Sequence, residues 1–244
     1  MSGFSHILGV KFNNVTHTEA VSLLECFLEE ERFHSVYTPN PEIVMAARKD
    51  SEFMEILNKA ELVVPDGIGV VIASRLTKEP LKERVAGYDL VQGLFSRIKN
   101  KKYTVYFFGG APGVAQEAKL KMEKTHKGLK IIGVSDGYFD EKKEKLILED
   151  IKNKKPDILL VGLGAPKQEK WIYEHKEQLP VRICIGVGGS FDGMSGKVKR
   201  APEIFIDLGL EWFYRLLRQP ARIFRMMKLP LFLLAVLKEK FFGK

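Results

Sequence analysis

Two patterns of apolar residues alternate along the chain. Short runs rich in Val, Ile, Leu and aromatic residues predict six buried strands. They lie at 34–38, 61–65, 103–109, 129–134, 157–164 and 181–188. Between them, apolar residues recur at helical spacing, at 18–31, 41–57, 87–100, 112–126, 141–154 and 166–178. This alternation predicts an α/β fold of the Rossmann-like kind, with a largely parallel sheet flanked by helices and right-handed crossovers.

The pattern changes after Pro202, where no further strand is indicated. Three helical pieces are expected, at about 203–219, 220–229 and 230–242, because Pro220 and Pro230 can each occupy the first turn of a new helix. We therefore divide the chain into an α/β body, 1–200, and a basic helical appendage, 201–244.

The charge is concentrated in this appendage. The whole chain carries +8, and the stretch from Arg215 to Lys244 holds eight basic side chains against one acid, Glu239, a net charge of +7. Such a surface indicates an anionic partner, with nucleic acid, anionic lipid and a phosphorylated substrate all open at this point.

Composition and cysteine usage place the protein in a broad class. Apolar residues make up 45% and charged residues 29%, which is typical of a globular protein. Cys26 and Cys184 lie among apolar neighbours and are expected to be reduced core residues, which favours the cytoplasm. No signal peptide is apparent, and the longest apolar run, at 229–237, is far shorter than the roughly 20 residues that span a bilayer.

Candidate chemistry gathers at the strand-to-helix turns, where ligands bind in folds of this kind. Asp66 follows a predicted strand and is either the N-cap of the next helix or a carboxylate able to take a proton from a hydroxyl. Gly109 and Gly110 begin "GGAPG", which is either a tight turn or a cradle of free N–H groups for a phosphate.

Other polar residues occupy similar turns. Thr38, Asn40, Arg84 and Gln168 are either turn and capping residues or a set that holds a sugar and a leaving phosphate. Tyr138 is either an ordinary half-buried tyrosine or a platform for a nucleobase. Asp192 either stabilises its glycine turn or accepts a hydrogen bond from a base or ribose.

Several common sites have no support in the sequence. "GLGAPKQEKWI" has Lys167 where a dinucleotide fingerprint needs its third glycine, and "SGKV" lacks the Ser or Thr of a P-loop. No Asp-x-Asp and no cluster with metal-ligand spacing occurs. We expect no cofactor and no metal.

Four arginines of the appendage are spaced three, four and three residues apart, which places them on one helical face. They are Arg215, Arg218, Arg222 and Arg225. The stripe is either a solvated cationic face or a binding site for phosphates. The apolar residues on the opposite side, together with the run after Leu229, suit a helix that lies in a lipid interface.

Seven ordered motifs together resemble the TagA/WecG/CpsF family of bacterial glycosyltransferases, also called glycosyltransferase family 26, over about residues 6–225. These motifs are "TPNPE", "PDGIGVV", "ERVAGYDLV", "FFGGAPGVA", "GLGAPKQEKWI", "GVGGSFDGMSGKVKRAP" and "GLEWFYRLLRQPAR". The resemblance implies an inverting, metal-independent transfer of an N-acetylmannosamine-type sugar from a UDP donor to N-acetylglucosamine on a polyprenyl diphosphate. In TagA-like members this reaction builds the linkage unit of wall teichoic acid.

The resemblance also implies roles for residues of this chain. Asp66 would be the general base, in a pocket lined by Thr38, Asn40, Arg84 and Gln168. The four arginines would hold the acceptor diphosphate at the inner face of the cell membrane, and Tyr138 and Asp192 would meet the uridine. Alternatives are transfer of the uronic acid form of the sugar, or of glucose, and, more distantly, a basic protein that binds nucleic acid. Self-association is expected through the apolar residues Ile204, Ile206, Leu208, Leu210 and Phe213.

Overall fold

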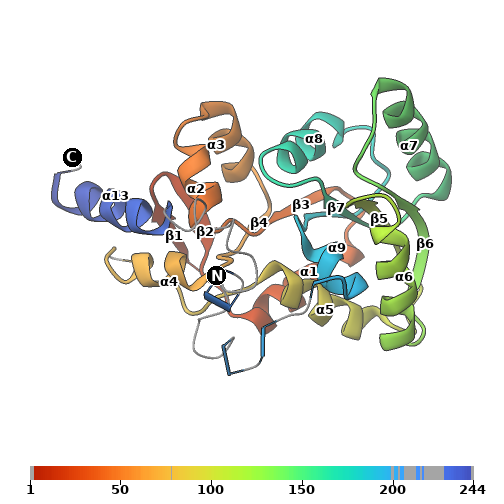
Figure 1. Ribbon diagram of the computed structural model, residues 1–244, viewed down its shortest axis with the longest axis horizontal. Coiled ribbons are helices and arrows are strands. Elements are labelled where there is room, and N and C mark those ends of the chain that lie inside the picture. Colours follow the sequence, from red (N-terminus) through yellow and green to blue (C-terminus); the bar gives the residue numbers. More distant parts are fainter. Residues whose placement is uncertain are drawn as a thin grey trace.

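A six-stranded parallel sheet forms the centre of the computed structural model (Figure 1), which describes residues 3–77, 79–198, 201–202, 204–205, 213–214, 216 and 228–242. Its strand order is β4-β3-β8-β7-β5-β6, and every neighbouring pair is parallel. The strands are β3 (His34–Tyr37), β4 (Leu62–Val63), β5 (Thr104–Gly109), β6 (Lys130–Ser135), β7 (Ile158–Gly162) and β8 (Ile183–Gly186). All six predicted strands are confirmed, and they belong to one sheet.

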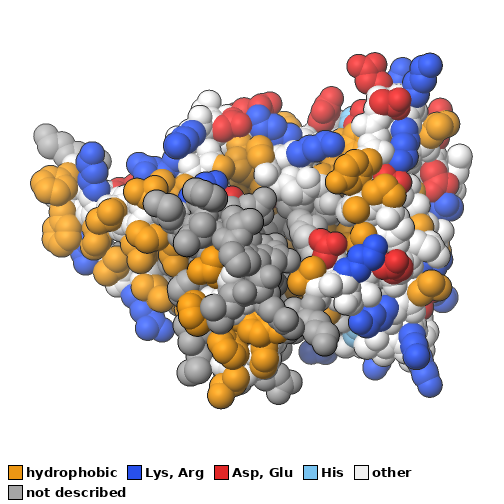
Figure 2. All heavy atoms as spheres, in the orientation of Figure 1, with side chains coloured by type: hydrophobic (Ala, Val, Ile, Leu, Met, Phe, Trp, Pro, Cys, Tyr) orange, Lys and Arg blue, Asp and Glu red, His pale blue; other side chains and the backbone are white. Residues whose placement is uncertain are grey.

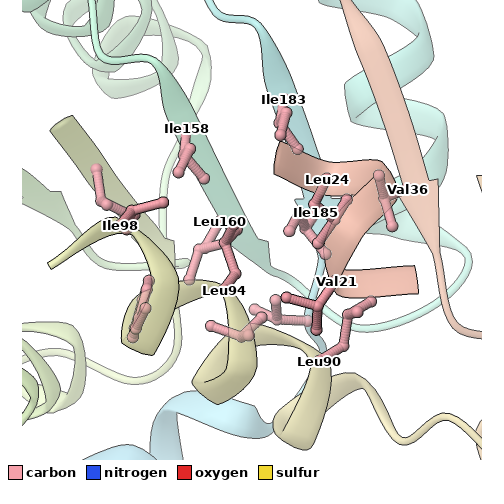
Figure 3. Close-up of a cluster of buried hydrophobic side chains, with 14 of the residues drawn as sticks. Val21, Leu24, Val36, Leu90, Leu94, Ile98, Ile158, Leu160, Ile183 and Ile185 are labelled. Carbon is pink, nitrogen blue, oxygen red and sulfur yellow. The ribbon is translucent and has the colours of Figure 1, made fainter. Parts of the chain in front are cut away.

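Both faces of this sheet are covered by helices, which explains why its strands read as continuous apolar runs. Along β5, Val105 and Phe107 face one core while Tyr106 and Phe108 face the other. The first core is completed by α1 (His17–Glu29), α5 (Gly87–Ile98), α6 (Val114–Thr125) and α9 (Ser190–Ser195). Figure 3 shows side chains of α1 and α5, among them Leu24 and Leu94, meeting Ile158, Leu160 and Ile185 of the sheet.

The second core lies on the opposite face. It is covered by α2 (Pro41–Ala47), α3 (Ser51–Asn58), α4 (Ile68–Ser74), α7 (Glu141–Lys154), α8 (Lys167–His175) and α13 (Lys228–Phe242). The prediction of one helix over 41–57 is wrong, because two helices occupy this range. The first ends at Ala47, and the second is capped by the carboxylate of Asp50, which accepts the Phe53 N–H at 3.0 Å. A capping residue of this kind can start a new helix even where the spacing of apolar residues continues without interruption.

A small antiparallel hairpin, β1 (Phe4–Ile7) and β2 (Val10–Asn13), was not predicted. Its two-residue turn places Leu8 at φ 52° and Gly9 at φ 88°, the combination that matches the twist of a tight hairpin. The buried side chains of Ile7, Val10 and Phe12 extend the second core. Each strand has only four residues, too few for its alternation to be separated from noise.

One cysteine differs from expectation. Cys184 is buried in β8, as predicted, but Cys26 is exposed on α1, so its assignment to the core is wrong. Leu24, Phe27 and Leu28 form the buried face of that helix, and Cys26 falls between them on the outer side. Neither thiol forms a disulfide in the part of the chain that the structure describes.

The helix α13 lies against α2 and α4 at one end of the molecule (Figure 1). Phe232 is fully buried in the second core, and Val236 is 4% exposed. Leu229 fills the space beside Gly69 so closely that a Cβ on that glycine would lie 2.5 Å from Leu229 Cδ1. Lys228 Nζ is 3.1 Å from Glu42 Oε1 on α2. The third predicted piece of the appendage is therefore confirmed as a helix, and it packs on the body.

Replacing Phe232 with Ala should lower the free energy of unfolding by about 3–5 kcal/mol, since it removes a fully buried aromatic side chain. Leu231→Ala is the matched control, because the neighbouring Leu231 is 55% exposed and its loss should cost less than about 0.5 kcal/mol. Urea unfolding without lipid measures both. Equal losses in the two variants would contradict the docked position of α13.

The other two predicted pieces, at 203–219 and 220–229, fall largely outside the described residues, as does the division at residue 200. Among the helices of the described ranges, none is both long and apolar enough to cross a membrane.

Candidate active site

Apart from Arg84, which precedes α5, the predicted site residues of the body lie at or after the carboxyl ends of the six sheet strands. Because the strands are parallel, these ends meet at one edge of the sheet. β4 leads to Asp66, β3 to Thr38 and Asn40, β8 to Asp192, β7 to Gln168, β5 to Gly109 and Gly110, and β6 to Tyr138. The fold thus brings to one edge residues that are more than 150 positions apart in the sequence.

Asp66 lies beside the turn that follows β3. Its backbone N–H donates to Pro39 O at 3.1 Å, which ties the end of β4 to the segment that carries Thr38 and Asn40. The side chain is half-buried. The N-cap of α4 is Gly67, at φ 113°, so the N-cap alternative for Asp66 is wrong. A residue with a side chain would be strained at that φ, and the glycine lets the chain turn sharply after the carboxylate.

Arg84 is brought next to Asp66 by the segment before α5. Val85 N–H donates to Pro65 O at 2.9 Å, so Arg84, which precedes Val85, and Asp66, which follows Pro65, belong to adjoining backbone. The Arg84 side chain is half-buried. Gly87, the first residue of α5, packs on Thr38 so tightly that a Cβ there would lie 2.7 Å from Thr38 Oγ1. A carboxylate, a guanidinium and a hydroxyl therefore gather at the β3–β4 end of this edge.

Asn40 has a structural task in the same group. It is the N-cap of α2, and its Oδ1 accepts the Ile43 N–H at 3.0 Å. The capping interpretation is confirmed for this residue. The cap uses the amide oxygen, so the NH2 group is the part of the side chain that can bind a ligand.

The glycine turn after β5 approaches its neighbour very closely. A Cβ on Gly109 would lie 2.4 Å from Gly162 O, and Gly110 N–H donates to that oxygen at 2.9 Å. Gly110 N–H is therefore not one of the free donors that the phosphate-cradle alternative requires. The positive end of α6, which begins at Val114 after Gly113, remains beside this turn.

Tyr138 is 68% exposed, so the alternative of a half-buried tyrosine is wrong. Its loop is fixed to the glycine turn by Gly137 N–H, which donates to Gly110 O at 2.8 Å. Asp136 accepts the Tyr138 N–H at 3.0 Å and pairs with Lys143 at 2.9 Å. Burial tends to raise the pKa of Asp136, but these hydrogen bonds outweigh it and the pKa is lowered. An exposed ring thus stands on an anchored loop.

Gln168 is only 4% exposed, at the start of α8. Its Oε1 accepts Gly188 N–H at 2.9 Å, and its Nε2 donates to Glu169 Oε1 at 2.8 Å. Glu169 was not predicted, yet burial raises its pKa to about 7. Its spacing of three residues from buried Ile172 is the signal in the sequence that could have placed it on the inward face of the helix.

Asp192 lies in the first turn of α9 and is half-buried. Its backbone holds the turn, since its N–H donates to Gly189 O at 3.2 Å and its C=O accepts from Ser195 Oγ at 3.0 Å. Its carboxylate faces Gly189, where a Cβ would lie 3.7 Å from Oδ2. Both expected roles, turn and ligand contact, fit this position.

The four arginines of the stripe, at 215, 218, 222 and 225, lie outside the described residues. Within the described ranges, no three His, Cys, Asp or Glu side chains gather as metal ligands would. What the described edge offers is a carboxylate, a guanidinium, hydroxyl and amide groups, an exposed aromatic ring and close-packed glycine turns. These groups suit proton abstraction from a hydroxyl and the binding of a phosphorylated nucleoside.

Comparison with known proteins agrees with this chemistry. The model of the "Glycosyl transferase WecG/TagA/CpsF family" matches residues 5–244. A protein of Bacillus spizizenii named N-acetylglucosaminyldiphosphoundecaprenol N-acetyl-beta-D-mannosaminyltransferase is 41% identical over 91% of this chain and 86% of its own length. Proteins of the same name from Bacillus subtilis and Staphylococcus aureus are 39% and 35% identical over 96% of this chain, covering 91% and 92% of their own lengths.

The family model and the Bacillus subtilis relative each align with nearly the whole chain, including the glycine turns and the segment of the four arginines. The chain therefore belongs to the WecG/TagA/CpsF family of glycosyl transferases.

Proposed function

We propose that this enzyme transfers N-acetylmannosamine from UDP-N-acetylmannosamine to the 4-hydroxyl of N-acetylglucosamine on undecaprenyl diphosphate. The observation that carries the proposal is the 41% identity, over 91% of the chain, to a relative named for that activity. The arrangement of Asp66 and Arg84 at the carboxyl edge of the sheet supports it independently.

Asp66 is proposed as the general base. Its carboxylate takes the proton of the acceptor hydroxyl while that oxygen attacks the anomeric carbon from the face opposite UDP. The bond between the anomeric carbon and the phosphate oxygen breaks, UDP leaves with the electron pair, and the configuration is inverted. Thr38 and the amide of Asn40 hold the sugar in reach of this carboxylate.

Departure of UDP places negative charge on its diphosphate, which must be stabilised. We assign this to Arg84, to the positive end of α6 beside the glycine turn, and to the arginines of the appendage, which also hold the acceptor diphosphate. Tyr138 is proposed to stack on the uracil, with Asp192 accepting a hydrogen bond from the uridine. The exposed ring and the anchored loop described above support this placement.

The protein is proposed to work at the inner surface of the cell membrane, where a polyprenyl-linked acceptor resides. Its α13 helix presents Leu231, Leu234, Phe241 and Phe242 on the surface, exposed by 55%, 61%, 69% and 81%. Figure 2 shows hydrophobic and basic side chains side by side at the α13 end of the molecule. Apolar groups beside lysines are typical of a helix that lies at lipid headgroup level.

Self-association remains a prediction. Of the five apolar residues named for it, Ile204 and Phe213 are described, with exposed fractions of 64% and 39%.

A panel of UDP-sugars with lipid-linked N-acetylglucosamine tests the function. We expect a disaccharide product with UDP-N-acetylmannosamine, and turnover at least tenfold lower with its uronic acid or with UDP-glucose. Efficient transfer from either of those donors would contradict the proposed donor specificity. If no donor supported transfer, the proposed activity itself would be rejected.

Removal of metal ions should leave turnover unchanged within about twofold, because cationic side chains and helix N-termini can supply the required positive potential. The measurement is UDP release before and after dialysis against EDTA, with added Mg²⁺ and Mn²⁺ as the comparison. A loss restored by either ion would contradict the metal-independent mechanism.

A further inference from the structure

Glu169 is a buried acid hydrogen-bonded to the predicted site residue Gln168, and the proposed mechanism does not use it. Its side chain lies in the first turn of α8 and is 2% exposed. Oε1 accepts the hydrogen bond from Gln168 Nε2, and Oε2 is buried without a hydrogen-bond partner among the described residues. An ionised carboxylate with so few donors is costly in an apolar interior, which favours the neutral acid.

The hydrogen bonds around Gln168 allow its amide only one orientation. Gly188 N–H is a donor, so the amide oxygen must face it, and the NH2 group is then directed to Glu169. Space is also restricted, since a Cβ on Gly186 would lie 2.8 Å from Gln168 Nε2 and 3.4 Å from Tyr37 Cδ1. The amide is thus fixed at the end of β8, the strand between β3 and β7.

One N–H of this amide has no acceptor in the described part of the chain. The amide lies at the carboxyl edge of the sheet, beside the end of β8, which is the strand next to β3 and the turn that carries Thr38. A donor fixed in this way can bind a substrate oxygen without first losing rotamer freedom, and a misplacement of about 1 Å can cost about a hundredfold in rate.

We propose that Glu169 is a positioning residue for the transfer reaction, whose neutral carboxyl group holds the Gln168 amide so that its second N–H binds the sugar donor. This inference rests on the proposed function. Glu169 itself does not touch the substrate.

Other titratable groups lie on the elements around Glu169, and the hydroxyl of one of them, Tyr37, donates to the Glu169 backbone O at 3.5 Å. They are Tyr37 on β3, Cys184 on β8, and Lys170 and His175 on α8. Burial raises the pKa of both Tyr37 and Cys184 well above their ordinary values. Lys170 pairs with Asp50 and Glu52 beside α3, and His175 contacts Glu144 on α7. Burial raises the pKa of Glu169 to about 7, with the Gln168 hydrogen bond opposing the shift.

Glu169→Gln is the conservative variant, since its amide oxygen can still accept from Gln168 but cannot ionise. We expect kcat at pH 6 within about twofold of wild type. Its stability should respond differently to pH. Between the ordinary pKa of 4.5 and about 7, the folded wild type holds a proton that the unfolded chain releases, so its stability falls as pH rises through this window. The Tm of the variant relative to wild type should therefore be higher at pH 8 than at pH 5.

Glu169→Leu removes the acceptor while filling the space. We expect kcat to fall about tenfold to a hundredfold, with the KM for the donor changed less than about threefold. In a Gln168→Leu background the same replacement should have little further effect on kcat, because the group that it positions is gone. Ile172→Val, a change of one buried methyl group on the same helix, is the control and should leave kcat unchanged.

The inference would be overturned if the reductions in kcat of the two single variants multiplied in the double variant. It would also be overturned if Glu169→Leu kept the kcat of wild type. A Glu169→Gln protein that is stable but inactive would overturn it as well. A second measurement does not depend on transfer. The side-chain amide NMR signals of Gln168 should shift around pH 7 in wild type and stay constant in Glu169→Gln. If the wild-type protein transfers no sugar, the proposed function is rejected. If the Gln168 amide signals of the wild type do not change with pH, the proposed role of Glu169 is rejected.

Discussion

Asp66→Asn should reduce kcat by about a hundredfold to ten-thousandfold, the range for loss of a general base. Asparagine keeps the shape of the side chain and cannot take the proton of the acceptor hydroxyl. The backbone bond from residue 66 to Pro39 O does not involve the side chain and should persist, so the fold and the binding of UDP are expected to remain. The measurement is UDP release with a short-chain lipid acceptor, together with UDP affinity by calorimetry.

Asp157→Asn is the matched control for this change. Asp157 precedes β7 at the opposite edge of the sheet, where its Oδ2 accepts the Thr104 N–H at 2.8 Å. Its replacement should cost some stability but leave kcat within about twofold. Near-normal turnover of a folded, UDP-binding Asp66→Asn protein would remove Asp66 as the base. Equal losses in both variants would point to general damage.

Serine at the four exposed apolar positions of α13 should release the protein from vesicles. At about 100° per residue, Leu231, Leu234, Phe241 and Phe242 lie on the side of the helix opposite Phe232 and Val236. A fully buried Leu or Phe contributes about 1.5–3 kcal/mol, so even partial insertion of four side chains predicts a roughly thousandfold lower partition coefficient. Sedimentation with vesicles containing anionic lipid measures it.

Leu120→Ser and Leu146→Ser provide the control for hydrophobicity alone. These residues are 61% and 64% exposed on α6 and α7, away from α13 (Figure 1), and their replacement should leave vesicle binding unchanged. Transfer to a long-chain acceptor in vesicles should fall with binding in the α13 variant, while transfer to a water-soluble acceptor should persist. Unaltered vesicle binding would show that α13 is not the lipid-facing element.

The sequence predicted the sheet well because burial on both faces leaves an unmistakable signal. All six strands were predicted, and their parallel order brings the residues predicted to follow them to the carboxyl edge of one sheet. Short elements were harder. A strand of four residues such as β1 is too short for its alternation of apolar and polar residues to be recognised. The apolar spacing continues from α2 into α3, but the cap at Asp50 starts a separate helix.

Local pattern could not predict contacts made across the fold. Gly110 N–H looked free in its own turn, but the partner that occupies it, Gly162 O, comes from another strand. Glu169 was not among the predicted site residues, and the packing of α8 over the sheet leaves it 2% exposed beside Gln168. Asn40 was weighed both as a cap and as a ligand contact, and the structure confirms the first.

The docking of α13 has a consequence for the proposed placement at the membrane, because it fixes this helix rigidly to the elements that carry the proposed base. The helix packs on α2 and α4, which begin directly after the turns that carry Asn40 and Asp66, and Leu229 reaches Gly69, three residues beyond the proposed base. If its outer face rests on the bilayer, the distance from lipid to base is set by rigid contact and not by a tether. The enzyme can then select its acceptor by reach, since the hydroxyl of the first sugar after the diphosphate arrives at that height and sugars farther out overshoot it.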